Sequence, residues 1–541
     1  MTVGTGDTGM LTAPTGSSLQ RLAEAAWERI GDEAVLVFEG RPWTLAELGL
    51  RARRLSAGLR DAGLRPGDRV VVMMANCPEV GVAYQATWRA GGVVTPVLFL
   101  LSEPELRHVL TDGEAALAVT TPEFLPKLVA AAGGPDETPA LRGTVLVGGD
   151  EATRAAAAEQ SGRPVHDLAA LEGGDEGPLA DVDPATPGAL LYTGGTTGRA
   201  KGVVLSHDAL SASAWGGVLT TVVESDDLGR SEVRLLPLPL SHVYGLMISV
   251  AGLHTPTGRT SVLMRWFDPV GFLELAQRYR ATVTSVVPSM LQLLLAQPLE
   301  DYDLSSLRQV GSGAAPLPRE VAEEFARRVP GVSVSEGYGC TETAGLISAS
   351  PVGRSRPGSV GQPTHGVEVR IELPDGSEAA TGQDGEITVR GPGLMTGYWR
   401  AERETAHALR GGRLHTGDVG HLDADGYLYV VDRLKDLVIR SGFNVYPRDV
   451  EDAMLTHPDV VAAAVVGRPD PAVGEEVVAY VQLRPGAEVT EAALVAHGRA
   501  VLSAAKYPRE VRVVPAVPLT SVGKLDRKKL RQAASVTAPP R

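Results

Sequence analysis

The chain has 541 residues, of which 43% are hydrophobic and 21% are charged, and its formal net charge is −14. This length is too great for a single core and predicts two or three domains in a folded, globular protein. The acidic balance gives no general attraction to nucleic acid or to an anionic membrane, so a polyanionic ligand has to be held by a local group of donors.

The N-terminal stretch and the cysteine content bear on the compartment. Residues 1–18 are rich in Gly and Thr and lack the basic start and apolar run of a signal peptide, so we expect a disordered N-terminus. Cys77 and Cys340 are too few for a disulfide framework, which favours a reducing, cytoplasmic location. The longest apolar run, near residues 92–101, is far shorter than the roughly 20 residues that cross a bilayer, so no transmembrane segment is expected.

Short apolar runs alternate with longer helical patterns through the first part of the chain. The runs at residues 70–74, 92–101 and 189–192 indicate buried strands, and the patterns at residues 44–64 and 103–110 indicate helices. This alternation predicts an α/β fold in which helices cover both faces of the sheets. Functional loops then leave the carboxyl ends of the strands.

The strand at residues 189–192 leads into a loop, residues 192–202, that contains four glycines, three threonines and one lysine. Glycine lets successive backbone N–H groups converge on phosphate oxygens, and Thr hydroxyls and a Lys ammonium add donors, so the loop is predicted to bind a polyphosphate. Its spacing lacks the adjacent Gly-Lys-Ser/Thr of a Walker A loop, which disfavours a P-loop NTPase. The candidate residues are Thr193, Gly194, Gly195, Thr196, Thr197, Gly198 and Lys201.

Two later motifs carry groups that suit the rest of a nucleotide. Residues 335–343 set an aromatic ring, glycines, threonines and a carboxylate close together. An aromatic face can stack on adenine, a carboxylate oxygen can bind Mg²⁺, and a hydroxyl can contact a phosphate. Asp418 and Arg433 offer a carboxylate and a guanidinium that suit the two hydroxyls of a ribose.

The pattern changes at residues 432–436, where charged residues interrupt the apolar runs. We place a domain boundary here, between a large domain at residues 19–433 and a small domain at residues 434–541, a size within the usual range. The small domain is predicted to be α+β, with helices at residues 447–456 and 491–502 and strands near Leu437, Val460, Val477 and Val511.

The segment from Tyr192 to Gly202 resembles the phosphate loop of the adenylate-forming superfamily, which comprises acyl-CoA synthetases, adenylation domains and beetle luciferases. The resemblance covers almost the whole chain. Gly194 stands where many members have Ser, and Ala200 where many have Pro, and both variants are similar to those of bacterial long-chain fatty-acyl-CoA synthetases. The resemblance implies a large N-terminal domain of α/β subdomains with a β-rich subdomain, and a small, mobile α+β C-terminal domain.

The resemblance also implies roles for residues of the large domain. By this likeness Tyr338 stacks on the adenine, with Gly339 beside it, Thr341 contacts the α-phosphate, and Glu342 binds Mg²⁺. The segment at residues 311–316 lines the adenine and acyl pockets with Gly313, Ala314 and Ala315; Asp418 and Arg433 hold the ribose; and His242 lies beside the acyl carboxylate, where it can gate the substrate channel.

In the small domain the same likeness makes Lys524 the catalytic lysine, whose ammonium bridges the attacking carboxylate and the α-phosphate. Lys435 matches the hinge between the two domains. Rotation about it removes Lys524 and brings in residues 441–447, whose Gly442 borders the pantetheine channel. One active site then serves two half-reactions.

Together these roles imply an ATP-dependent ligase that forms an acyl-AMP and passes the acyl group to coenzyme A, with ATP, Mg²⁺ and coenzyme A as cofactors. A medium or long-chain fatty acid is the first choice of small-molecule carboxylic acid, because the motif variants resemble bacterial fatty-acyl ligases. The alternatives are an aryl acid, transfer to a carrier-protein thiol, and activation of nitrite for diazotisation. A non-catalytic nucleotide sensor and a luciferase-like oxygenase are rivals of other kinds.

Overall fold

The computed structural model describes residues 16–193, 199–223, 232–255, 259–350, 353–519 and 525–536. The chain divides into two compact units: unit 1 comprises residues 1–368 and 389–414, and unit 2 comprises residues 369–388 and 415–541. Helices and strands alternate through unit 1, and strands dominate unit 2, so the predicted α/β fold with a smaller α+β part at the C-terminus is confirmed. The hinge near Lys435 stays a prediction.

One sheet of unit 1 contains the strand that leads into the predicted phosphate loop. β3, β4, β5, β6, β7 and β8 pair in parallel, whereas β9 runs antiparallel to β8 and β19 runs antiparallel to β9. In sheet order the strands are β19 (Gly397–Tyr398), β9 (Lys201–Ser206), β8 (Pro187–Thr193), β4 (Val93–Pro96), β3 (Arg69–Met73), β5 (Ala115–Thr120), β6 (Gly143–Leu146) and β7 (Val165–Asp167).

The second sheet of unit 1 carries two of the other predicted motifs at the carboxyl ends of its strands. All its pairings are parallel except that of β1 with β2. In sheet order the strands are β14 (Ser333–Glu336), β13 (Gln309–Ser312), β12 (Val283–Val286), β10 (Val233–Leu236), β11 (Thr260–Leu263), β1 (Ala34–Phe38) and β2 (Arg41–Thr44). A short pair, β15 (Ser348–Ala349) and β16 (Gln362–Pro363), lies apart from both sheets.

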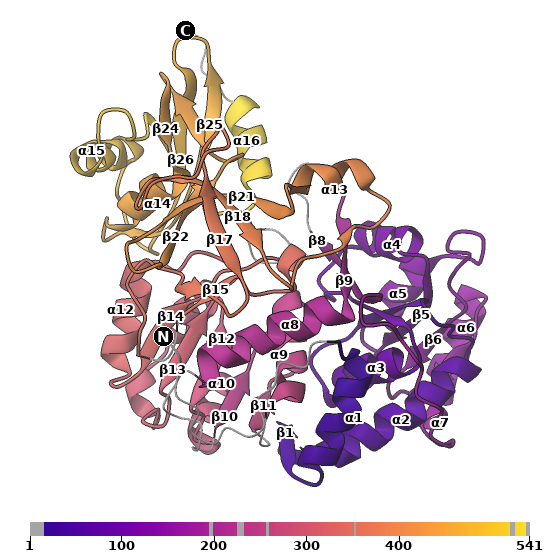
Figure 1. Ribbon diagram of the computed structural model, residues 1–541. Helices are drawn as coiled ribbons and strands as arrows, with labels where there is room; N and C mark the ends of the chain where they lie inside the picture. The colour runs from indigo at the N-terminus through magenta and orange to yellow at the C-terminus, as the bar shows by residue number, and fades with distance from the viewer. Residues whose placement is uncertain are drawn as a thin grey trace. The chain divides into compact units, whose positions relative to one another are not determined.

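Helices cover both sheets, as buried valine-rich strands require. One apolar cluster joins α1, α2, α3, α8 and α9 to the eight-stranded sheet, and Figure 1 shows α8 lying between the two sheets of unit 1. The helices of unit 1 are α1 (Leu19–Ile30), α2 (Leu45–Asp61), α3 (Pro78–Arg89), α4 (Glu103–Asp112), α5 (Leu125–Ala132), α6 (Glu151–Ser161), α7 (Leu168–Leu171), α8 (His207–Val218), α9 (Val243–His254), α10 (Pro269–Arg278), α11 (Pro288–Leu295), α12 (Arg319–Arg328) and α13 (Glu402–Ala408).

Unit 2 contains most of one sheet and all of another. The first has the order β17 (Glu368–Glu372), β18 (Gly385–Arg390), β21 (Arg413–Leu422) and β20 (Leu409–Arg410), with β22 (Leu428–Arg433) paired to β21. The second has the order β24 (Phe443–Val445), β23 (Val438–Arg440), β26 (Gly474–Leu483) and β25 (Val460–Asp470), with β27 (Glu510–Val513) paired to β26. The helices of unit 2 are α14 (Pro447–Leu455), α15 (Glu491–Val501) and α16 (Arg527–Val536).

The elements expected from the sequence are present. The helix expected at residues 103–110 is α4, and it begins where its first turn is capped: the Ser102 N–H and hydroxyl both donate to the Glu105 carboxylate. The strand expected at residues 92–101 is shorter, because β4 ends at Pro96, which has no N–H for the ladder.

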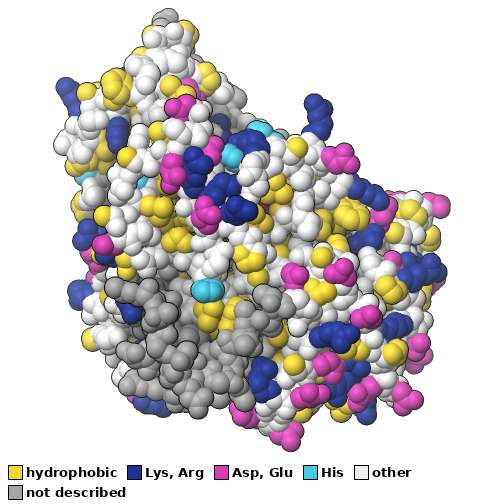
Figure 2. Space-filling model, viewed as in Figure 1, with side chains coloured by type: hydrophobic (Ala, Val, Ile, Leu, Met, Phe, Trp, Pro, Cys, Tyr) yellow, Lys and Arg dark blue, Asp and Glu magenta, His cyan; other side chains and the backbone are white. Residues whose placement is uncertain are grey.

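Charged side chains of both signs lie on the surface. On the face shown in Figure 2, Lys and Arg side chains are interspersed with Asp and Glu side chains. Among the helices that the structure describes, none is both long enough and apolar enough to cross a membrane.

Candidate active site

The two stems of the predicted phosphate loop are directly opposite one another. β8 ends at Thr193 and β9 begins at Lys201, and these two residues pair across the antiparallel ladder. The fold therefore brings together the first and last candidate residues of the loop. The other candidates, Gly194, Gly195, Thr196, Thr197 and Gly198, lie outside the described residues.

Helix α4 contacts both stems of this loop. The Tyr192 hydroxyl donates to Asp112 Oδ2 at 2.6 Å on one side, and His108 Nε2 lies 2.8 Å from the Ala200 carbonyl oxygen on the other. Burial raises the pKa of Tyr192, and the bond to Asp112 raises it further, so the hydroxyl stays protonated and acts as the donor. His108 and Asp112 are four residues apart and thus lie on one face of α4.

Glu342, the predicted Mg²⁺ ligand, is held by a residue that the sequence did not indicate. The Tyr398 hydroxyl donates to Glu342 Oε1 at 2.8 Å, and the Met395 N–H donates to the Glu342 carbonyl oxygen at 2.8 Å. The Lys201 ammonium lies 4.9 Å from the centroid of the Tyr398 ring. One tyrosine therefore contacts both the lysine of the phosphate loop and the predicted metal ligand.

The segment around Glu342 is a tight turn after β14. Thr341–Thr343 form one turn of 3₁₀-helix, and Ala344 closes it with a left-handed φ of 55°. A Cβ added at Gly339 would lie 1.6 Å from the Gly345 carbonyl oxygen, so only glycine fits where the two ends of the turn meet. Tyr338 forms a bridge with Ser348 that fixes the backbone beside the turn.

The predicted adenine and acyl segments meet because β13 and β14 are parallel neighbours. Ser312 pairs with Glu336 at the carboxyl ends of these strands, and the Gly337 N–H donates to the Ser312 carbonyl oxygen at 2.9 Å. Gly313 follows β13, and Ala314 has a left-handed φ of 68° that turns the chain back toward Ala315. Residues 313–315 and 337–339 thus lie at one edge of the sheet, as a ligand site at strand ends requires.

His242 lies at the start of α9. Its Nδ1 accepts from the Tyr244 N–H at 3.3 Å, so the imidazole caps the helix and its Nε2 carries the proton when the ring is neutral. Tyr244 extends along residues 311–313: a Cβ at Gly311 would lie 3.8 Å from the Tyr244 hydroxyl oxygen, and one at Gly313 would lie 3.8 Å from its Cε1. The start of α9 and the glycine-containing end of β13 are therefore adjacent.

In unit 2, the two predicted ribose ligands are neighbours. Asp418 on β21 pairs with Arg433 on β22, and Arg433 Nε lies 2.9 Å from Asp418 Oδ1. The carboxylate is nearly buried, with 8% of its side chain exposed, whereas 43% of the Arg433 side chain is exposed. This geometry holds the carboxylate in place and leaves the guanidinium accessible to a ligand.

The predicted hinge and pantetheine residues also lie in unit 2. Burial lowers the pKa of the Lys435 ammonium, and Arg433 lowers it further. Ser441 and Gly442 connect β23 to β24 as a two-residue turn in which both residues have positive φ, 53° and 79°. The Lys435 carbonyl oxygen accepts from Arg531 of α16 at 3.2 Å, and the helix begins shortly after Lys524, which lies outside the described residues.

The donor set fits a magnesium ion that arrives with its nucleotide. Across the described ranges, no group of three or more His, Cys, Asp or Glu side chains could hold a metal by itself. Mg²⁺ in nucleotide sites is commonly bound by one or two carboxylates together with substrate phosphates and water. A single oriented carboxylate such as Glu342 matches that requirement.

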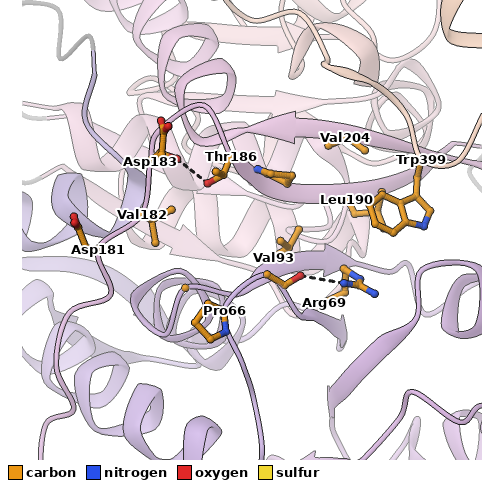
Figure 3. A pocket seen from close by; sticks show the side chains of 13 residues that line it. Pro66, Arg69, Val93, Asp181, Val182, Asp183, Thr186, Leu190, Val204 and Trp399 are labelled. Carbon is orange, nitrogen blue, oxygen red and sulfur yellow. Dashed lines mark hydrogen bonds between the residues drawn. The ribbon is translucent and has the colours of Figure 1, made fainter. Parts of the chain in front are cut away.

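One cavity of unit 1 contains none of the predicted site residues. It has a volume of about 330 Å³, and Figure 3 shows the Trp399 indole beside Leu190 at one side of it, with Val93, Val204 and Arg69 nearby. The Trp399 indole N–H donates to the Asp112 carbonyl oxygen at 2.9 Å. Trp399 follows the end of β19 and lines the cavity, whereas the hydroxyl of Tyr398, the last residue of β19, bonds to Glu342.

Sequence reasoning found the glycine-rich segments and missed the residues that contact the stems of the loop and Glu342. Tyr398, Asp112 and His108 contact residues that are 56, 80 and 92 positions away in the chain. The one local signal was the position of His108 and Asp112 on one face of a helix with a clear capping box. Tyr398 had no comparable signal.

Comparison with known proteins covers nearly the full length of the chain. The model of the AMP-binding enzyme family matches residues 23–399, and that of the AMP-binding enzyme C-terminal domain matches residues 449–524. Similar proteins include a feruloyl-CoA synthase from Amycolatopsis sp., which is 37% identical over 91% of this chain and 94% of its own. A long-chain-fatty-acid–CoA ligase from Bacillus subtilis is 33% identical over 95% and 94%.

Solved structures agree with this similarity. An amide bond synthetase from Marinactinospora thermotolerans is 32% identical and superposes with a TM-score of 0.84, covering 96% of this chain and 100% of its own. The match extends through both units, so the likeness includes the small C-terminal part as well as the large one.

Proposed function

The chain belongs to the AMP-binding enzyme family, and on that premise we propose that it is an ATP-dependent acid–CoA ligase that activates an aromatic carboxylic acid. The observation that carries the proposal is the meeting of two groups at Tyr398. Lys201, from the predicted phosphate loop, lies over its ring, and Glu342, the predicted metal ligand, accepts from its hydroxyl. A lysine that can bind phosphate and a carboxylate that can bind a metal ion, placed this close together, suit a nucleoside triphosphate.

In the first half-reaction the acid's carboxylate attacks the α-phosphorus of ATP, an acyl-AMP forms, and pyrophosphate leaves. Donors from residues 193–201 hold the phosphates, Thr341 contacts the α-phosphate, and Lys524 offsets the charge that grows as two anions approach. Mg²⁺ bound at Glu342 supplies further neutralisation of the phosphate charge. No protein nucleophile is required, because positioning and charge neutralisation lower the barrier.

In the second half-reaction the thiol of coenzyme A attacks the acyl carbon, and AMP leaves. We assign the ribose to Asp418 and Arg433, the adenine to Tyr338 and the glycine-rich turns, and the pantetheine channel to Gly442. Lys435 is the proposed hinge of the rotation that moves Lys524 out of the active site and brings Gly442 to it. ATP and coenzyme A are both available in the cytoplasm, so we place the reaction there.

Two observations support an aromatic acid. The Tyr244 ring lies against Gly311 and Gly313 of the predicted acyl segment, and an aromatic surface there can stack on a planar ring. The feruloyl-CoA synthase, which is named for an aromatic acid, is 37% identical to this chain. A medium or long-chain fatty acid is the second candidate, because the Bacillus subtilis ligase is 33% identical.

The experiment that tests this function is pyrophosphate release with Mg-ATP across hydroxycinnamic acids, benzoic acids, fatty acids and nitrite, with and without coenzyme A. Products are identified by mass. We expect release with aromatic acids and the matching acyl-CoA.

Other outcomes point elsewhere. Release with fatty acids alone would favour the second candidate. Release without a thioester product would point to a carrier protein, an amine or nitrite as the second partner. Absence of release with every acid would contradict the ligase and favour a nucleotide sensor.

A further inference from the structure

The segment 395–399 contacts Glu342 at its backbone and at its side chain. The Met395 N–H donates to the Glu342 carbonyl oxygen at 2.8 Å, which fixes the backbone of the turn. The Tyr398 hydroxyl donates to Glu342 Oε1 at 2.8 Å, which fixes the carboxylate itself. The backbone bond alone would leave the glutamate side chain free to rotate, so the hydroxyl is the contact that decides where the second carboxylate oxygen points.

Tyr398 is itself held on several sides. It pairs with Val203 of β9 in an antiparallel ladder, and its N–H donates to the Thr405 hydroxyl oxygen at 2.9 Å. The next residue, Trp399, packs at the cavity in Figure 3 and donates its indole N–H to the Asp112 carbonyl oxygen. The ladder pairing, the bond to Thr405 and the packing of Trp399 together restrain this segment. The Tyr398 hydroxyl therefore has a defined position before any ligand binds.

The ring of Tyr398 has a second contact. Lys201 and Val203 are two residues apart on β9 and therefore share a face of the sheet, and Tyr398 pairs opposite Val203 on that face. The Lys201 ammonium lies 4.9 Å from the ring centroid, within the range of a cation–π interaction. The hydroxyl and the ring thus act on two different charged groups.

We propose that Tyr398 is a positioning residue for metal–nucleotide binding: its hydroxyl holds one oxygen of Glu342 so that the other oxygen can bind the cation, and its ring holds Lys201 beside the phosphates. This inference rests on the proposed function, in which Glu342 binds Mg²⁺. Partners that hold a metal ligand in orientation typically change metal affinity by about 10- to 100-fold when they are removed. Tyr398 acts through Glu342 and Lys201 and does not touch the reacting atoms.

The test measures binding of a non-hydrolysable nucleotide, α,β-methylene-ATP, to the full-length protein by calorimetry, once at saturating Mg²⁺ and once in EDTA. The ratio of the Kd in EDTA to the Kd at saturating Mg²⁺ is the factor by which the metal strengthens nucleotide binding, and we call this factor the metal gain. Tyr398→Phe keeps the ring and deletes the hydroxyl, so we expect this gain to fall by about tenfold or more, while the Kd in EDTA is unchanged. Tyr398→Leu removes the ring as well, so its Kd in EDTA rises too.

Two further variants make the result specific. Tyr429→Phe is a matched control, because it deletes a hydroxyl that lies 3.4 Å from the carboxylate of Asp423 in unit 2; its metal gain should equal that of the unmodified protein. Glu342→Gln should abolish the gain. In the Glu342→Gln background Tyr398→Phe should have no additional effect, because both changes act on one metal contact.

A metal gain in Tyr398→Phe within twofold of the unmodified protein would overturn the inference, and so would an equal fall in Tyr429→Phe. If Glu342→Gln keeps the full gain, the metal does not bind at Glu342, and the inference fails with that assignment. Pyrophosphate release with a carboxylic acid is measured separately, so the ligase activity can stand even when this inference fails.

Discussion

The two units hold their candidate residues by different kinds of contact. In unit 1 the contacts to Glu342 and to the stems of the phosphate loop come from a tyrosine hydroxyl, a backbone N–H and an imidazole. In unit 2, ion pairs connect α16 to the residue after the predicted hinge and to α14: Asp436 pairs with Arg531 at 2.5 Å, and Glu451 pairs with Arg527. The first arrangement depends little on salt, because its donors are largely uncharged.

This difference has a physical reason. Unit 1 places its turns at the carboxyl ends of parallel strands, where backbone geometry does most of the positioning. Unit 2 is small, and the carboxylates of Asp436 and Glu451 are nearly buried, with 9% and 10% of their side chains exposed. Buried charges require partners, so the loss of one partner is costly. We therefore expect the units to respond differently to substitution, to salt and to pH.

The largest expected effect is that of Lys524→Ala, which separates the chemical contributions of the two units. Loss of a single donor that stabilises developing charge typically lowers the rate by about 10²- to 10³-fold. We expect that loss in acyl-AMP formation, measured as pyrophosphate exchange, whereas thioester formation from supplied acyl-AMP is spared. Lys528→Ala, on the neighbouring helix, is the control. Equal losses in both half-reactions would contradict the assignment.

The next effect concerns stability and should be confined to unit 2. Arg527 donates to both oxygens of Glu451 and, at 2.9 Å, to the Val465 carbonyl oxygen. Arg527→Met leaves the Glu451 carboxylate buried without its cationic partner, with only the Val465 N–H, among the described residues, still donating to it, and the loss of such a partner typically costs about 3–5 kcal/mol. We expect calorimetry to show an early unfolding transition of unit 2, whereas Arg484→Met, at an exposed arginine of the same unit, should change little. A single transition with unchanged Tm would mean that the pair is not needed.

Acid should act mainly on unit 1. His207 and His254 are buried there, and burial lowers the pKa of each imidazole from 6.5 to about 4. Because the folded protein favours the neutral ring, this stability is complete above pH 6.5 and is lost as the pH falls from 6.5 toward 4. Each histidine should contribute a loss of about 2 kcal/mol between pH 7.5 and pH 5.

The measurement is the free energy of unfolding of unit 1 as a function of pH, by denaturant titration. His207→Gln should flatten the slope between pH 6.5 and pH 5 by about half, since His254 remains. If the slope is the same in the variant and the unmodified protein, His207 is not the titrating group.

What the sequence could predict follows from how local each signal is. The glycine-rich segments that follow β8 and β14 are visible in the sequence because their characteristic residues lie within about ten consecutive positions. Asp418 and Arg433 were both assigned to the ribose by the resemblance, but the sequence did not predict that they pair with each other across adjacent strands, as the structure shows. Tyr398 could not be found, because its partner Glu342 is 56 residues away and a single sequence contains no information about that pairing.

The smallest expected effect tests whether α4 positions the phosphate loop. Tyr192→Phe removes the hydroxyl that donates to Asp112 at 2.6 Å, a hydrogen bond worth about 1 kcal/mol, or roughly fivefold in an equilibrium constant. A looser stem weakens the hold on ATP, so we expect the KM for ATP to rise by about this factor while kcat changes less.

The control for this prediction is Tyr302→Phe, at an aromatic residue beside the apolar cluster of the other sheet. Asp112→Asn should have a smaller effect than Tyr192→Phe, because the amide oxygen can still accept from the tyrosine. A fall in kcat with an unchanged KM for ATP would place Tyr192 in the chemical step. The hydrogen bond from Tyr192 would then not act by holding the loop stem for ATP, and α4 would lose the positioning role proposed for it.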